Sequence, residues 1–145
     1  MPGNQPHPEI YDLLSHTGDL GLTIYGPDLP ALFAHAAWAM FDQISDATTI
    51  RPQQALTIHL EGADLADLLV RWLSELLYLY DTQRFMCCTA TFSTLEATQL
   101  TATARGEPFD AARHPVDTEI KAVTYHQITV EQAADRWQAR VIFDL

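Results

Sequence analysis

The chain has 145 residues, of which 48% are hydrophobic and 19% charged, and this length and composition predict one domain with its own hydrophobic core. Nineteen acidic residues against eight basic ones give a formal net charge of -11, and the basic residues are scattered singly. Direct nucleic-acid binding needs clustered lysine and arginine, so the composition argues against it and favours a cation or a basic protein as partner.

The N-terminal residues 1–10 contain three prolines and neither a basic region nor an apolar run. We expect a flexible arm at 1–10, followed by a single domain at 11–145. Because signal peptides and membrane-spanning helices need an apolar run, neither secretion nor a membrane association is expected. The adjacent Cys87 and Cys88 are expected to be reduced thiols, which suits a cytoplasmic location.

Two segments show the apolar spacing of amphipathic helices. The first begins after Asp28, which can cap it, tolerates Pro30 in its first turn, and keeps the spacing to Ile44. The second begins after Asp64 and keeps the spacing to Tyr80. Exposed positions of the second helix are acidic rather than basic, so we expect its apolar stripe to pack on a core and not on a membrane.

The other segments alternate apolar and polar residues, which is typical of strands. They lie at 11–14, 20–25, 56–61, 85–92, 100–104, 126–130 and 137–145. This order predicts an α+β fold with mostly antiparallel sheets covered by the two amphipathic helices. The longest irregular segment is expected at 106–117, where two prolines interrupt the pattern.

The last strand ends the chain with two carboxylates. Side chains alternate across a strand, so Val141 and Phe143 share one face while Ile142 and Asp144 share the other. The side chain of Asp144 and the α-carboxylate of Leu145 then lie close together, and such a pair is relieved by a shared proton or a cation.

Five segments together resemble the archease family, and the match runs in order from about Tyr11 to Leu145. They are His16-Thr17-Gly18-Asp19-Leu20-Gly21, the run from Trp72 to Leu79, Gly106 to Asp110, Glu119 to His126, and Arg140 to Leu145. One difference is Gly18, where the family usually has Ala. The resemblance implies a small α+β protein that binds a divalent metal and activates the RtcB-type RNA ligase of tRNA splicing and RNA repair.

The resemblance also implies the metal ligands, which are Asp19, Asp144 and the C-terminal Leu145. Ligands that are all oxygen suit calcium, magnesium or manganese rather than zinc, and calcium is our first expectation. Asp19 lies in a glycine-flanked turn, so a hydrogen bond to the turn backbone is the structural alternative.

Three further residues could support this site, namely His16, Lys121 and His126. Each also has a structural interpretation. The histidines can serve as hydrogen-bonding residues of turns, and Lys121 can form an ion pair with Glu119 or Asp110.

The resemblance therefore favours a non-catalytic activator that promotes guanylylation and multiple turnover of an RtcB-type ligase. An alternative is a metal-dependent hydrolase that uses Asp19, Asp144 and His126, and another is a chaperone-like module that binds protein or RNA. The chain has no P-loop, no Gly-x-Ser-x-Gly and no His-Glu-x-x-His, so an independent enzyme is not expected.

Overall fold

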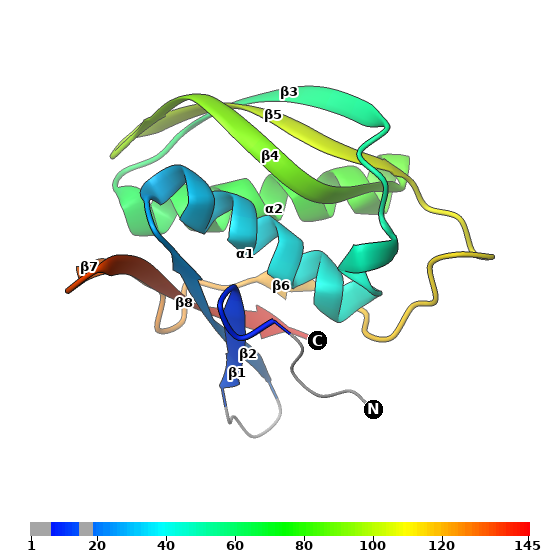
Figure 1. Ribbon diagram of the computed structural model, residues 1–145, viewed down its shortest axis with the longest axis horizontal. Helices are drawn as coiled ribbons and strands as arrows, with labels where there is room; N and C mark the ends of the chain where they lie inside the picture. The colour runs from blue at the N-terminus through cyan, green and yellow to red at the C-terminus, as the bar shows by residue number, and fades with distance from the viewer. Residues whose placement is uncertain (1–6, 15–18) are drawn as a thin grey trace.

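The computed structural model describes residues 7–14 and 19–145 and has three layers (Figure 1). A three-stranded sheet forms one outer layer, two helices lie in the middle, and a larger sheet forms the other outer layer. In chain order, the elements are β1 (Tyr11–Leu14), β2 (Leu20–Gly26), α1 (Leu29–Ile44), the 3-10 helix η1 (Ala47–Thr49), β3 (Gln54–Glu61), α2 (Leu65–Gln83), β4 (Phe85–Glu96), β5 (Gln99–Pro108), β6 (Ala122–Val123), β7 (Thr129–Ala133) and β8 (Arg136–Asp144).

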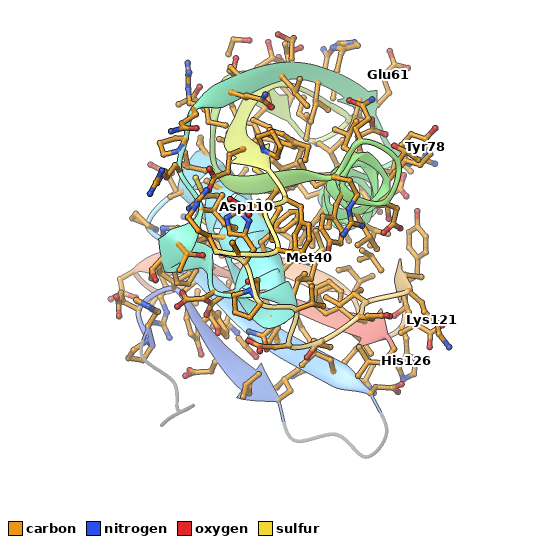
Figure 2. The ribbon with its side chains drawn as sticks, turned by 90° about the vertical axis from the view of Figure 1, so that its right-hand side faces the viewer. Met40, Glu61, Tyr78, Asp110, Lys121 and His126 are labelled. Atoms are coloured by element: carbon orange, nitrogen blue, oxygen red, sulfur yellow. The ribbon has the colours of Figure 1, made fainter. Side chains whose placement is uncertain are left out.

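Both helices begin where the sequence predicts. The carboxylate of Asp28 accepts a hydrogen bond from the N–H of Ala31 at 2.8 Å, and that of Asp64 accepts one from the N–H of Asp67 at 2.8 Å. These caps satisfy N–H groups that have no partner inside the helix. The helices bury their apolar faces between the sheets, with Met40 at the centre of the molecule (Figure 2).

All strand pairs are antiparallel, which confirms the predicted α+β class. The smaller sheet has the order β3-β5-β4, and the larger one has the order β1-β2-β8-β6, with β7 also paired to β8. β8 is therefore the central strand, flanked by β2 on one side and by β6 and β7 on the other. Ile142, on the face of β8 opposite Val141 and Phe143, is also buried and only 2% exposed.

The irregular segment begins later than predicted. Instead of 106–117, it runs from Phe109 to Lys121, because β5 continues through Gly106 to Pro108. A side chain at Gly106 would clash with the carbonyl group of Met86 on β4. The glycine thus permits the close approach of two strands. In the sequence, a glycine with this role looks the same as a glycine that begins a loop.

Residues 7–10 of the predicted arm form a turn against α1 and β2. The ring of His7 packs edge-on against that of Trp38, with 4.6 Å between their centroids. The carbonyl of Ile10 accepts a hydrogen bond from the N–H of Tyr25 at 2.8 Å. In the part of the chain that the structure describes, neither helix has the length and apolar character needed to cross a membrane.

Candidate functional site

Asp19 and Asp144 leave the larger sheet at the same end of adjacent strands. The β2–β8 register pairs Leu20 with Phe143, and the next residue outward on each strand is the aspartate. Both side chains are exposed. Two segments from opposite ends of the sequence thus place two carboxylates side by side at one edge of the molecule.

β6 places Lys121 and Leu145 at the same edge. Ala122 pairs with Asp144, and the N–H of Lys121 donates a hydrogen bond to the carbonyl oxygen of Asp144 at 2.8 Å. Leu145 is 41% exposed, so this end of the chain is open to solvent. In the described residues Lys121 forms no salt bridge, so the alternative ion pair with Glu119 or Asp110 is not present there.

His126 lies on the same side of the molecule as Lys121 (Figure 2). Its backbone N–H donates to the hydroxyl of Thr124 at 3.2 Å, and that hydroxyl donates to the carbonyl oxygen of Ile142 at 2.8 Å. The turn is therefore fixed to β8 while the imidazole remains exposed. His16, the other histidine predicted to support the site, lies outside the described residues.

The donor set of this edge fits a hard divalent cation. It consists of the carboxylates of Asp19 and Asp144 and the α-carboxylate of Leu145, all oxygen ligands that calcium, magnesium and manganese prefer. Between 7–14 and 19–145, no three side chains of His, Cys, Asp and Glu form a metal-binding group. The predicted set differs from such a group because it has two side chains and relies on the chain terminus for the third carboxylate.

A cluster at the start of α2 ties the segment around Lys121 to the helix. The hydroxyl of Tyr125 donates to Asp67 at 2.6 Å, and Asp67 also accepts from the N–H of Ala63 at 2.8 Å and from Nε of Arg71 at 2.9 Å. The bond from Tyr125 and then those from Ala63 and Arg71 stabilise the charged form, so the pKa of Asp67 falls to about 2.

We expect Tyr125→Phe to raise the pKa of Asp67 from about 2 towards its ordinary value of 3.8, because the largest stabilising hydrogen bond is lost. In the wild type, the low pKa means that this carboxylate stabilises the fold above pH 3.8, and that the stabilisation is lost as the pH falls through about 2. Carboxyl-carbon NMR titration measures the shift. Tyr78→Phe, at an exposed tyrosine in α2, is the control and should leave the Asp67 titration unchanged. Identical Asp67 titrations in the two variants would show that the hydrogen bond from Tyr125 does not lower the pKa of Asp67.

A buried charged cluster fixes the beginning of the 109–121 segment, and sequence reasoning missed it. Glu107 is 2% exposed and His114 0%. Glu107 accepts from Nη2 of Arg113 at 2.5 Å, from Nε2 of His114 at 2.9 Å and from the N–H of Arg51 at 2.9 Å. The N–H of Asp110 donates to Nδ1 of His114 at 2.9 Å. Because a backbone N–H can only donate, Nδ1 accepts and Nε2 carries the proton given to Glu107.

Burial of Glu107 acts to raise its pKa, because a buried charge loses its hydration. The hydrogen bonds from the backbone of Arg51 and from the side chains of Arg113 and His114 outweigh burial, so the pKa lies below its ordinary value. The only signal in the sequence was the position of Glu107 within a motif, with Arg113 and His114 six and seven residues later. Nothing in that spacing shows that Glu107 and His114 are buried or that Arg113 reaches Glu107.

Comparisons with known proteins agree with this fold over nearly the whole chain. The model of the Archease protein family (MTH1598/TM1083) matches residues 11–145. The protein archease of Methanosarcina acetivorans is 38% identical over 139 residues, which cover 93% of this chain and 95% of that protein.

Two solved structures have the same fold. The solution structure of Methanobacterium thermoautotrophicum protein 1598 gives a TM-score of 0.77 at 30% identity, covering 94% of this chain and 99% of that one. The crystal structure of a Thermotoga maritima protein, described as an archease and possible chaperone, gives a TM-score of 0.60 at 16% identity, covering 100% and 99%. At that low identity, the second likeness concerns the fold alone.

Proposed function

The chain belongs to the archease family, and on this premise we propose that it is a non-catalytic, metal-binding activator of an RtcB-type RNA ligase. It would act in the cytoplasm and promote guanylylation and multiple turnover of the ligase in tRNA splicing and RNA repair. The observation that supports this proposal is the meeting of Asp19, Asp144 and the C-terminus of Leu145 at one exposed edge.

In this proposal, the three carboxylates hold a divalent cation, calcium first and magnesium or manganese as alternatives. The cation supplies positive charge that neutralises the carboxylates and can be shared with oxygen ligands of a partner. Asp144 extends from the central strand of the larger sheet, which gives its carboxylate a rigid support. An exposed site on a rigid strand suits contact with another protein better than reaction within a cleft.

The surroundings of His126 support a non-catalytic role. A general base is normally oriented by a hydrogen-bonding partner. In the described residues, the imidazole of His126 has no such partner, and only its backbone N–H is bonded. The hydrolase interpretation with Asp19, Asp144 and His126 therefore lacks an ordered base. Turnover of phosphoesters by the purified protein would establish the hydrolase instead.

The net charge of -11 bears on the partner. A chain of this charge repels RNA phosphates, so the ligase would provide the basic surface and bind the RNA. Tight binding of tRNA by this protein alone, in a gel-shift titration near physiological salt, would contradict this division of roles.

Ligation kinetics test the proposal directly. Added in substoichiometric amount, the protein should convert single-turnover ligation by its cognate RtcB-type ligase into multiple turnover and accelerate formation of the ligase-guanylate adduct. An activator that dissociates after each cycle needs no stoichiometric amount. Unchanged turnover and unchanged adduct formation would refute the activator proposal.

A short C-terminal extension is expected to abolish the stimulation. It converts the Leu145 carboxylate into a neutral amide and continues the chain through the space next to Asp144, so one of three anionic ligands is lost. The matched control carries the same extension before Met1, at the other end of the chain. Equal stimulation of the ligase by the two proteins would show that the terminal carboxylate has no role.

A further inference from the structure

A groove of about 610 Å³ lies between the C-terminal turn of α2 and residues 116–121. Arg84 and Tyr80 line it from the helix side, and Ile120 and Lys121 line it from the opposite segment. Its volume lies in the range of small-molecule sites, roughly 300–1,000 Å³. The groove is therefore large enough for a ligand, and its lining residues define which chemistry it would accept.

The guanidinium of Arg84 is held in place at this groove without a carboxylate partner. It lies 4.6 Å from the ring centroid of Tyr80 and 4.8 Å from that of Phe109. Its backbone caps α2 in the left-handed conformation, with φ of 59°, and its carbonyl accepts a hydrogen bond from the N–H of Phe109 at 2.7 Å. Stacking on two rings orients the cation and leaves its N–H groups available.

Lys121 gives the lining of the groove a second cation. In the described residues, neither Arg84 nor Lys121 forms a salt bridge, although acidic residues far outnumber basic ones in this chain. The N–H of Lys121 is bonded to Asp144, which fixes the backbone from which the ammonium extends. Two cations that line one groove, neither of them in a salt bridge, are suited to an anionic group between them.

Apart from Thr118, the rest of the lining is apolar, aromatic or acidic. Val116 is 45% exposed and gives the groove an open apolar side chain beside the cations, whereas Ile120 is buried. Asp81 and Glu119 line the same groove and offer hydrogen-bond acceptors. A complementary ligand has an anionic end, a flat or apolar part, and N–H or O–H donors.

We propose that this groove binds a nucleotide, with its phosphates between Arg84 and Lys121 and its base against the apolar wall. The base and ribose provide the donors that Asp81 and Glu119 can accept. An acidic peptide would also satisfy the two cations, but its charges are spread along its length and would meet Asp81 and Glu119 as well, whereas a nucleotide carries its charge at one end and its N–H and O–H donors at the other. Chemical complementarity therefore favours a nucleoside phosphate. The groove shares Lys121 with the edge that carries the three carboxylates, but none of these carboxylates belongs to its lining.

The test is a titration of the complete protein with adenosine triphosphate and, separately, guanosine triphosphate, monitored by amide chemical shifts and calorimetry. EDTA is present throughout, so a metal at the carboxylates cannot contribute. We expect saturable shifts of the amides of Arg84, Ile120 and Lys121. Inorganic tripolyphosphate should bind more weakly than the nucleotides, because it lacks the base and ribose.

Arg84→Gln and Lys121→Gln should each weaken nucleotide binding by about tenfold or more, since each removes a charged hydrogen-bond donor. Arg84→Lys, which keeps the positive charge, should recover part of the affinity. The matched control is Arg105→Gln, at an exposed arginine of β5 in the other sheet, and it should bind as the wild type does.

Three outcomes would overturn the proposal. They are the absence of saturable shifts with either nucleotide, binding of tripolyphosphate as tight as that of the nucleotides, and binding of a glutamate-rich peptide in preference to them. Failure here would leave the activator proposal intact, because that proposal is tested through the ligase. Conversely, nucleotide binding in EDTA would stand even if the protein did not stimulate the ligase.

Discussion

Asp144→Ala is expected to abolish stimulation of the ligase and to weaken manganese binding by at least about tenfold, while the fold remains. The substitution removes one of three anionic ligands, and a lost charged contact accounts for roughly tenfold or more in affinity. The side chain of Asp144 is exposed, and its backbone pairing with Ala122 does not depend on it. Asp19→Ala should have the same effect, because its carboxylate lies on the neighbouring strand of the same edge.

Calorimetric titration with manganese and with calcium measures the first effect, and adduct formation by the ligase measures the second. Asp135→Ala is the matched control. This aspartate is exposed in the turn between β7 and β8, at the end of β8 opposite to Asp144. Its metal affinity and stimulation should equal those of the wild type. If Asp144→Ala binds the metals as well as the wild type, the three-carboxylate site is wrong. If it loses metal binding but still stimulates the ligase, activation does not need the metal.

Glu107→Ala is expected to lower the free energy of unfolding by about 3–5 kcal/mol at pH 7, the usual cost of removing one partner from a buried ionic cluster. The truncation removes an acceptor of Arg113 and leaves Nε2 of His114, which is fully buried, without its acceptor in a place where water cannot replace it. Urea unfolding followed by circular dichroism measures the change. The expected fall in melting temperature is roughly 10–16 °C for a domain of this size.

The effect of Glu107→Ala should depend on pH in a defined direction. The folded pKa of Glu107 lies below its ordinary value of 4.5, so its carboxylate stabilises the fold fully above that value, and the stabilisation is lost as the pH falls below it. The difference between variant and wild type should therefore narrow in acid. Glu131→Ala, at an exposed glutamate of β7, is the control and should stay within about 0.5 kcal/mol of the wild type. Equal stability of Glu107→Ala and the control would show that the cluster does not stabilise the fold.

The sequence was sufficient for features that depend on neighbouring residues. Both helices start at the predicted caps, Asp28 and Asp64, because a cap and its target N–H are three residues apart. The strand alternation of the last residues also held for Val141 and Phe143, which face the core. Periodicity reports which face of an element is apolar, and this is a local property.

Local sequence patterns could not predict which strands pair with each other. That Asp19 lies next to Asp144 follows from the β2–β8 register, which joins the two ends of the chain, and only the family resemblance had brought these residues together beforehand. The same limit applies to Ile142, which is buried although the alternation along β8 places it on the face opposite Val141 and Phe143.

The Glu107 cluster and the groove between Arg84 and Lys121 depend on tertiary structure in the same way. Charged residues are mostly exposed, so a sequence gives no reason to place Glu107 and His114 in the interior. The clash that reserves Gly106 for glycine likewise involves Met86 on a different strand. Caps and periodicity arise from contacts within a few residues, whereas register, burial of charge and the facing walls of a groove exist only after distant segments have packed together.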